Sequence, residues 1–462
     1  MRSLSRHLLN RVIAPEGEIL FCAAFRKYPK KRRLDCRFSL RSSARQMSAK
    51  QCYCVTSVIN FIPSLNIPML LTRLIKLPLR YKPWRPAHLA LILDDVIGLS
   101  TQPILPDEDH LKAVIAWIGH AQDQRLGYAD EGGVSAGWSF EDGWLPSYPE
   151  TSGYIIETLL AAAKVLADPT LIARAERIVD WELSIQNSTG SFPGHFGEVG
   201  SKPVIFNTGQ IMHGMIAGYS AFDRTECLDA AVRAGHWMVS QQDDDGCWRR
   251  SEHNDTPHTY NARSAWALLR TGLIANEKLL VESAIKNIHW ALAQQTVSAW
   301  FKTNAFTEKG LPFTHNIAYA IRGILESGLL LDNEEMINVA IKAAKEIARQ
   351  QRIDGWLAGT YDDNWVPMAN YCCLTGLAQM TIIWQRLIHT QGIDELKMPV
   401  ERGIDFIKTN HHLSSKYDYQ RGAIAGSAPI WGRYSMFEYP NWAAKFFADA
   451  LMLKLARINI PE

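Results

Sequence analysis

"WMVSQQDDDGCW", residues Trp237–Trp248, is the stretch that decides the fold of this chain. It runs from an aromatic anchor to a Gln five positions later, and from there into a turn that contains Gly and Trp. The anchor-to-Gln spacing recurs in WIGHAQ, WELSIQ and WALAQQ, and in the degenerate copies EIARQQ and FIKTNH. The six anchors stand at residues 117, 181, 237, 290, 346 and 406, so they are 64, 56, 53, 56 and 60 residues apart. Six units of similar length predict a fold built from internal repeats.

Each unit combines two helical patterns joined by a loop. The first pattern has apolar residues at three- and four-residue spacing and ends near the Gln. The second opens with small and polar residues and then becomes strongly apolar, as in NARSAWALLRTG and HNIAYAIRGILESGLLL. Twelve such helices in six hairpins predict an all-α fold, an (α/α)6 toroid with an inner ring of helices inside an outer ring. The links from first to second helix are long, so functional loops are expected on one face.

Two resemblances follow from these patterns. The Gln-x3-Gly-x-Trp element of Gln242–Trp248 resembles the repeat of terpene-cyclase and prenyltransferase toroids, whereas the six hairpins equally resemble six-hairpin glycosidases, toroidal polysaccharide lyases and the C-terminal domain of glucuronyl epimerases. From about residue 105 the chain is also similar to a family encoded in bacterial exopolysaccharide-synthesis clusters. The stretches that carry this likeness are PETSGYIIETLL, FNTGQIMHGM, PHTYNARSAWALLR, THNIAYAIRGILESG, NYCCLTGLAQM and AIAGSAPIWGRYSMFEYPNWAAKFFADAL. The resemblance implies a role in polysaccharide biosynthesis, with the synthesis machinery as a partner.

Charge divides the chain into two parts. Residues 1–85 hold 18 of the 49 Lys and Arg residues and three acidic residues, about +15, which leaves about −13 for the rest. We expect a basic N-terminal extension over residues 1–85, poorly ordered or membrane-peripheral, and the toroid over residues 86–462. MLLTRLIKLPLRYKPWRP, Met69–Pro86, is a basic amphipathic stretch suited to a membrane surface. The Arg- and Ser-rich composition also fits a transit peptide, and a third interpretation is translation from Met47 or Met69.

The acidic body argues against nucleic-acid binding, and a cytoplasmic, membrane-peripheral location is expected.

Candidate site residues are those at the starts of the inner helices and in the loops of the same face. The catalytic candidates are His258, Tyr260, Arg263, His315, Glu150 and Glu438. The substrate-binding candidates are Asn207, Asn261, Asn316, Trp144, Trp365, Tyr371, Arg433 and Tyr434. This set suits a uronic-acid-containing polysaccharide or oligosaccharide, because removing the proton next to a carboxylate needs a base, an acid and groups that stabilise enolate-like charge. The first hypothesis is therefore an enzyme of lyase or epimerase type.

Three alternatives stay open. A glycoside hydrolase would use two carboxylates across the scissile bond, with Glu150 and Glu438 as the pair, since units one and six adjoin when the ring closes. A polysaccharide-binding or scaffold protein would need no catalysis. A terpene cyclase or prenyltransferase would need an apolar cavity, which the polar residues at the starts of the inner helices disfavour. The sequence has no Gly-rich nucleotide-binding loop and no paired zinc ligands, so neither a cofactor nor a metal is expected.

Ordinary structural roles compete with these assignments. In DTPHTYNAR, Thr256 and Pro257 are predicted as the N-cap and first residue of a helix, so that the polar residues after them fill a first turn. The four cysteines of the body are expected to be buried thiols. The functional hypothesis depends on several units converging on one cavity.

Overall fold

The computed structural model describes residues 80–196 and 201–455. They belong to two compact units, one ending at Ile97 and the other beginning at Gly98. In the first unit the described residues form helix α5 (Pro86–Val96), which has its proline in the first turn. The predicted N-terminal extension, up to residue 79, lies outside the described residues.

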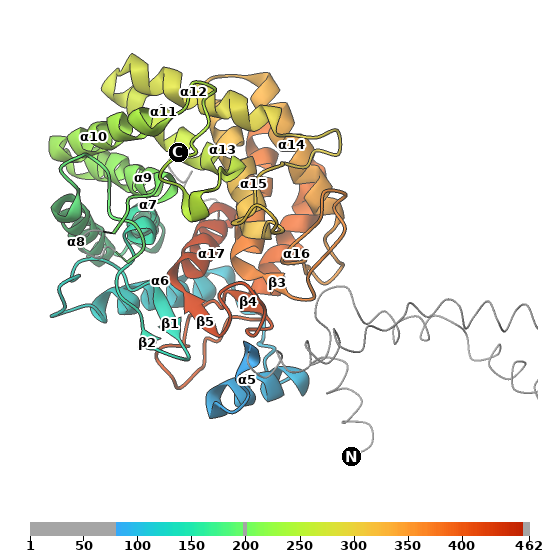
Figure 1. The fold of residues 1–462 in the computed structure, drawn as a ribbon. Helices are drawn as coiled ribbons and strands as arrows, with labels where there is room; N and C mark the ends of the chain where they lie inside the picture. The colour runs from blue at the N-terminus through green and yellow to red at the C-terminus, as the bar shows by residue number, and fades with distance from the viewer. Residues whose placement is uncertain (1–79, 197–200, 456–462) are drawn as a thin grey trace, which may run out of the picture. The chain divides into compact units, whose positions relative to one another are not determined.

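The second unit contains, among its described residues, two concentric rings of six helices (Figure 1). The inner ring consists of α7 (Pro149–Leu166), α9 (Ile205–Phe222), α11 (Ala262–Ala275), α13 (Thr314–Leu330), α15 (Leu374–Gln391) and α17 (Asn441–Lys454). The outer ring consists of α6 (Asp107–Asp123), α8 (Thr170–Ile185), α10 (Thr225–Gln241), α12 (Lys278–Ala293), α14 (Glu334–Arg349) and α16 (Lys397–Lys408). Each inner helix packs against the next, and α17 packs against α7 to close the ring. The predicted all-α (α/α)6 toroid is confirmed.

The two rings differ in how much of each helix is buried. In α9 every residue from Ile205 to Ile216 is buried, whereas α14 buries one stripe and leaves the other residues half-buried or exposed. Small residues let the inner helices approach closely: a Cβ at Gly323 would lie 2.3 Å from the backbone nitrogen of Arg263. The strongly apolar second helix of each unit is therefore the inner one, because only there does a helix have neighbours on nearly all sides.

The repeated Gln has a structural role. Nε2 of Gln242 donates to the carbonyl of Gly246 in its own loop and to the carbonyl of Ser283 in the next outer helix, both at 3.0 Å. Gln122, Gln186 and Gln351 make the same pair of bonds, and Gln295 makes the second one. One amide thus closes the turn and ties consecutive units together, which explains why the spacing recurs.

Short strands and 3-10 turns organise the loop face. Strands β1 (Gly137–Ser139), β2 (Gly143–Trp144) and β5 (Glu438–Pro440) form an antiparallel sheet with Trp138 opposite both Trp144 and Tyr439. Strand β3 (Cys372–Cys373) pairs with β4 (Ser427–Ala428), and the 3-10 turns are η2 (His253–Asp255), η3 (Thr259–Asn261) and η4 (Asp394–Leu396). Since β1 follows the first outer helix and β5 precedes the last inner helix, their pairing joins units one and six at this face.

One predicted helix boundary is wrong. Thr256 has extended backbone angles and follows η2, and helix α11 begins only at Ala262, after η3. The backbone N–H of Thr259 donates to the carbonyl of Thr303 at 2.8 Å, so the neighbouring loop holds this segment outside the helix. A tertiary hydrogen bond therefore overrides the local cap signal.

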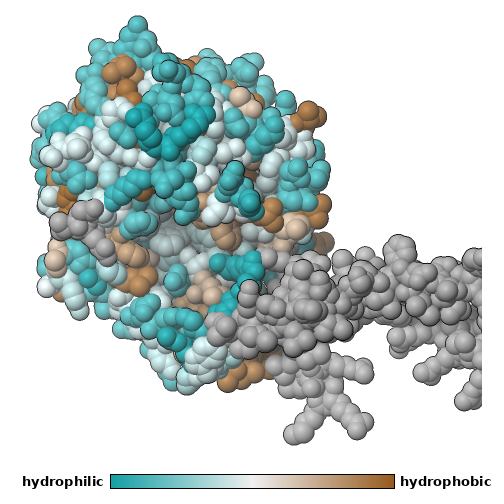
Figure 2. All heavy atoms as spheres, in the orientation of Figure 1, coloured by the Kyte–Doolittle hydropathy of each residue, from teal (hydrophilic) through white to brown (hydrophobic). Residues whose placement is uncertain are grey.

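The described part of the chain has a largely hydrophilic face and buried cysteines. Figure 2 shows the same side as Figure 1, where hydrophilic residues cover much of the face around a central recess. Within the described part of the chain, no helix combines the length and apolarity that crossing a bilayer requires. Cys227, Cys247, Cys372 and Cys373 are buried and unbridged, as expected.

Candidate functional site

A cavity of about 350 Å³ opens where the inner helices begin. Its lining comes from the starts of α7, α9, α13 and α17 and from the loops before α11, α13 and α17. The lining residues are Tyr148, Glu150, Tyr154, Phe206, His253, Tyr260, Phe306, Phe313, His315, Asn316, Tyr319, Arg433, Tyr434, Ser435 and Trp442. Nine of these fifteen are aromatic, so the cavity is less polar than the sequence suggested. Its volume lies in the range of small-molecule sites, about 300–1,000 Å³.

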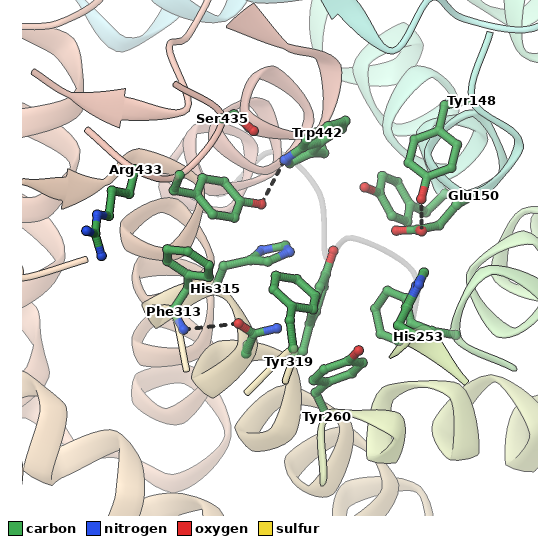
Figure 3. Close-up of a pocket in the computed structure, with 15 residues that line it drawn as sticks. Tyr148, Glu150, His253, Tyr260, Phe313, His315, Tyr319, Arg433, Ser435 and Trp442 are labelled. Atoms are coloured by element: carbon green, nitrogen blue, oxygen red, sulfur yellow. Dashed lines mark hydrogen bonds between the residues drawn. The ribbon is translucent and has the colours of Figure 1, made fainter. Parts of the chain in front are cut away.

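Glu150 and Tyr148 form a hydrogen-bonded pair on one wall (Figure 3). The Tyr148 hydroxyl donates to Oε2 of Glu150 at 2.7 Å. Burial raises the pKa of Glu150 to about 7, and the hydrogen bond from Tyr148 and the charge of Arg263 oppose this only in part. Burial, with the adjacent Glu150, also raises the pKa of Tyr148 well above its ordinary value. At neutral pH Glu150 is therefore poised to give or take a proton.

His315 lies on the opposite wall. In a closed ring of six, α13 is diametrically across from α7, and Figure 3 shows His315 and Glu150 on opposite sides of Tyr319. Nδ1 of His315 lies 3.1 Å from the amide oxygen of Gln379, which accepts a hydrogen bond from the Nδ1–H group and leaves the lone pair on Nε2. Burial lowers the pKa of His315 to about 3, so the ring is neutral at pH 7 and can accept a proton.

A second histidine, His253, lies at the η2 turn and lines the same cavity as Glu150 and Tyr260 (Figure 3). Burial and the neighbouring His258 and His195 lower the pKa of His253 to about 4. The predicted catalytic residue His258 does not line the cavity. Its Nε2 lies 3.0 Å from the carbonyl oxygen of His253, and its ring stacks on Tyr260 with centroids 4.4 Å apart. His258 therefore supports the lining residues His253 and Tyr260.

Several lining side chains carry buried polar atoms without a hydrogen-bond partner among the described residues, and Tyr260 and Asn316 are two of them. Within the described chain, the hydroxyl of Tyr260 and Nδ2 of Asn316 have no hydrogen-bond partner, although both are buried. Oδ1 of Asn316 accepts from the backbone of Phe313 at 3.0 Å, which fixes the amide with its N–H groups free. Buried polar groups without partners are costly, so a ligand that donates and accepts hydrogen bonds fits this cavity.

Arg263 lies directly beneath the cavity and does not line it. Its Nε donates to Gln210 at 2.7 Å, and its guanidinium faces the rings of Tyr319 and Trp266, each at 5.3 Å. Its positive charge contributes to lowering the pKa of both Glu150 and His315. The predicted contact of Arg263 with substrate is thus replaced by an electrostatic effect from behind Tyr319.

A layer of buried charges continues below Arg263 and draws on all six inner helices. Arg270 pairs with Glu157 at 2.8 Å and contacts Nδ1 of His213. Glu326 binds two guanidiniums, those of Arg322 and Arg386, and Lys445 pairs with Asp449.

The net charge of this layer affects which ligands the cavity favours. Among the described residues, five cations stand against three carboxylates there: Arg263, Arg270, Arg322, Arg386 and Lys445 against Glu157, Glu326 and Asp449. The floor of the cavity is therefore electropositive, which favours a ligand that carries a negative charge.

The structure does not bring several other predicted residues into the cavity. Asn207 lies behind the Glu150 pair, with Nδ2 3.5 Å from the Tyr148 hydroxyl, and Asn261 donates to buried Glu252 at 2.7 Å. Tyr371 belongs to a small buried cluster with Cys373 and Tyr434.

Three more predicted residues, Trp144, Trp365 and Glu438, do not line the cavity and make contacts elsewhere in the fold. Trp144 packs against Trp117 and Trp138, and Trp365 packs edge-on against Trp300 with its Nε1 bonded to the Ser298 carbonyl. Glu438 sits opposite Ser139 in the small sheet, where burial and the charge of Asp142 raise its pKa to about 7. Ring closure brings units one and six together, but Glu438 does not line the cavity itself and instead bonds the lining residue Ser435.

Of the predicted residues, the cavity thus contains Glu150, Tyr260, His315, Asn316, Arg433 and Tyr434. Tyr148, His253 and Tyr319 are functional candidates that were not selected from the sequence. Tyr148 precedes the helix-starting Pro149, and Tyr319 lies one turn into α13, so the same rule of inner-helix starts could have found both. His253 lies in a loop whose path only the tertiary structure decides. Across the described chain, no three His, Cys, Asp or Glu side chains are grouped to hold a metal ion.

Comparison with known proteins identifies the class of fold. Residues 146–325, less than half of the chain, match the family model of the squalene-hopene cyclase C-terminal domain. The unsaturated glucuronyl hydrolase of Bacillus sp. GL1, responsible for glycosaminoglycan degradation, is similar with a TM-score of 0.61 and 11% identity, over 75% of this chain and 96% of that one.

Two further solved structures extend this result. The cellobiose 2-epimerase of Bacillus thermoamylovorans has a TM-score of 0.61 and 13% identity, over 76% and 98% of the two chains. A family 88 glycosyl hydrolase of Bacteroides vulgatus has a TM-score of 0.54 and 14% identity, over 77% and 100%. No curated protein sequence matches the chain. At these identities the likeness shows the fold, an (α/α)6 toroid that these carbohydrate-active enzymes share.

Proposed function

We propose that this protein is a carbohydrate-active enzyme that moves a proton at a ring carbon of a uronate-containing glycan, in the manner of an epimerase or lyase. The observation that carries the proposal is the placement of one carboxyl group, Glu150, and one neutral imidazole, His315, on opposite walls of a single cavity. Inverting or eliminating at a carbon next to a carboxylate needs an acid and a base disposed about the same ring.

The proton transfer can be followed through these groups. The substrate carboxylate lies toward the electropositive floor, and Nε2 of His315 accepts the proton from the neighbouring carbon while the electron pair moves into the carboxylate. Protonated Glu150 then delivers its proton to the opposite face of that carbon, which inverts it, or to the leaving glycosidic oxygen, which completes an elimination. The anionic substrate raises the pKa of His315 from its low value in the free protein, since a nearby negative charge favours imidazolium.

Hydrolysis by two carboxylates is less well supported. Inverting and retaining glycosidases place two carboxyl groups about 5–9.5 Å apart across the scissile bond. Among the described lining residues Glu150 is the only carboxylate, and Glu438 lies in the sheet outside the cavity. Several of the similar solved structures are hydrolases, so hydrolysis is retained as an outcome of the test.

Carbocation chemistry is the second candidate, because nine aromatic rings line the cavity and the squalene-hopene cyclase model matches residues 146–325. A protonated Glu150 could start such a reaction. The unsatisfied polar atoms of Tyr260 and Asn316 favour a hydroxyl-bearing ligand over a hydrocarbon, since a hydrocarbon would leave both without partners.

The biological setting in this proposal is bacterial exopolysaccharide synthesis, supported by the six sequence stretches from residue 105 onward that resemble proteins of such clusters. The substrate is an acidic polysaccharide or its oligosaccharide ends, because a cavity of about 350 Å³ accommodates a short segment. Residues 1–85 would provide a peripheral contact with the inner face of the membrane. A binding or scaffold role without catalysis is the alternative that the experiment must exclude.

Incubation with uronate-terminated oligosaccharides in D₂O tests the proposal. Deuterium at the carbon next to the carboxylate indicates epimerisation, and new absorbance of an unsaturated uronate indicates elimination. Both should disappear in Glu150→Gln and His315→Gln but persist in Glu176→Gln, a change at an exposed position of outer helix α8. New reducing ends without deuterium would show hydrolysis instead. No product from any uronate, or turnover of a prenyl diphosphate, would overturn the proposal.

A further inference from the structure

A second cavity, of about 640 Å³, lies on the same face and shares a wall with the first. Phe306 lines the first cavity, while its neighbours Ala305 and Thr307 line the second. The carbonyl of Phe306 accepts from Nδ2 of Asn254 at 2.7 Å, which anchors this wall to the loop before α11. Three loops, those before α11, α13 and α15, therefore frame a site distinct from the one described above.

Asn304 is the feature that points to a ligand. Its side chain is 3% exposed and lines the second cavity, yet neither Nδ2 nor Oδ1 has a hydrogen-bond partner within the described chain. An amide buried in this way loses its bonds to water without replacement, which costs free energy unless a bound molecule supplies them. The missing partner must both donate a hydrogen bond to Oδ1 and accept one from Nδ2.

The charged side chains that line the second cavity limit the classes of ligand that can bind there. Asp255, Glu308, Asp362 and Asp363 line the cavity, and no Lys or Arg does. Asp255 pairs with Lys202 at 2.8 Å, and the remaining carboxylates disfavour an anionic group by repulsion. A metal ion would satisfy Oδ1 of Asn304 but leave the N–H groups of Nδ2 facing a cation, and no metal-binding group of three acidic, His or Cys side chains occurs among the described residues.

A neutral sugar ring meets all of these conditions. Its hydroxyl groups donate to carboxylates, and a hydroxyl beside Asn304 can accept from Nδ2 while a second donates to Oδ1. Trp300 and Phe301, which also line the cavity, offer apolar surface to the C–H face of a ring. We propose that the second cavity is a binding site for a neutral sugar unit of a glycan, held by Asn304 and the surrounding carboxylates.

This inference rests on the proposed function only in taking the ligand to be part of a glycan. The first cavity has an electropositive floor and the second an acidic lining, so the two select opposite kinds of sugar unit. A glycan that contains both uronate and neutral units could occupy both cavities, with the Phe306 wall between them.

Saturation-transfer NMR on the full chain tests the second site with three neutral disaccharides, cellobiose, maltose and lactose, at millimolar concentration. We expect at least one to bind. Asn304→Ala should weaken that binding about tenfold, the effect of losing one well-made hydrogen-bonding group. His315→Gln, in the first cavity, and Asn364→Ala, an exposed amide of the nearby loop that lines neither cavity, should bind as the unaltered protein does.

The outcomes separate this proposal from the proposed function. Binding that depends on Asn304 supports the second site whether or not the enzyme incorporates deuterium into uronates. Absence of binding by all three disaccharides, or binding lost in His315→Gln and retained in Asn304→Ala, would overturn it. Thermal stabilisation by calcium chloride that disappears in Asn304→Ala would overturn it in favour of a cation site. Circular dichroism of each variant confirms that it is folded.

Discussion

Replacing Glu150 by Gln should stabilise the protein above pH 7 while abolishing its activity. In the folded protein burial raises the pKa of Glu150 from its ordinary 4.5 to about 7. The unfolded chain therefore releases this proton near pH 4.5, whereas the folded chain keeps it until about pH 7. The free energy of unfolding of the unaltered protein falls across this interval, because the unfolded state gains from ionisation earlier.

The size of the effect follows from the pKa difference. A difference of one in pKa corresponds to about 1.4 kcal/mol. Raising the pKa of Glu150 from 4.5 to about 7 thus costs about 3 kcal/mol of stability at pH 8. A glutamine of the same shape is neutral at every pH and can still accept the hydrogen bond from Tyr148. The gain in unfolding free energy from Glu150→Gln should be near zero below pH 4.5 and about 3 kcal/mol above pH 7.

Urea unfolding followed by tryptophan fluorescence at several pH values between 4 and 8 measures this gain. Glu176→Gln is the matched control, since this side chain on α8 is exposed and its replacement should change the unfolding free energy little. The reasoning is refuted if the gain from Glu150→Gln does not change between pH 4.5 and 7.5, or if the variant is less stable than the unaltered protein at pH 8.

Three further predictions concern other groups. His315→Gln should reduce turnover about 10²–10⁴-fold. Because burial lowers the pKa of His315 to about 3, the unaltered protein loses stability as the pH falls below 6.5. The variant should therefore be the more stable of the two in urea at pH 4 but not at pH 8. Glu326→Gln should lower the unfolding free energy by about 3–5 kcal/mol, because it leaves the buried guanidiniums of Arg322 and Arg386 without a carboxylate, and equal stability in urea would contradict this. Asn304→Leu should raise the unfolding free energy by about 1–2 kcal/mol, since it removes an unsatisfied buried amide, and a lower thermal midpoint would mean that Asn304 has a structural partner.

The fold could be predicted because its information is local and repeated. The spacing from Trp237 to Gln242 recurs in four units and, in degenerate form, in the other two, and the amide of Gln242 closes a turn four residues away while it reaches the next outer helix. Because this contact is repeated from one unit to the next, the same residue spacing is repeated along the sequence. The alternation of amphipathic and strongly apolar helices records which ring each helix joins, since burial decides which residues are tolerated.

The site could be predicted only in part, because its residues meet through loops of different paths. Glu150 and His315 follow the rule that inner-helix starts converge, and the cavity contains both. His258 and Glu438 follow the same rule but do not line the cavity: His258 stacks on the lining residue Tyr260, and Glu438 bonds the lining residue Ser435. His253 enters through a loop that carries no repeat signal at all.

The sequence by itself determined the ring of six hairpins, the face that carries the long loops and the set of helices whose starts surround the axis, because periodicity and spacing depend on residues close in the chain. Only the tertiary structure decided which side chains face the cavity and what proton affinity they have. Burial moves the pKa of Glu150 to about 7 against the charge of Arg263, and burial together with that charge moves the pKa of His315 to about 3; burial without a partner makes Asn304 a candidate ligand-binding residue. These properties come from desolvation and from charges on distant segments, which no local pattern encodes.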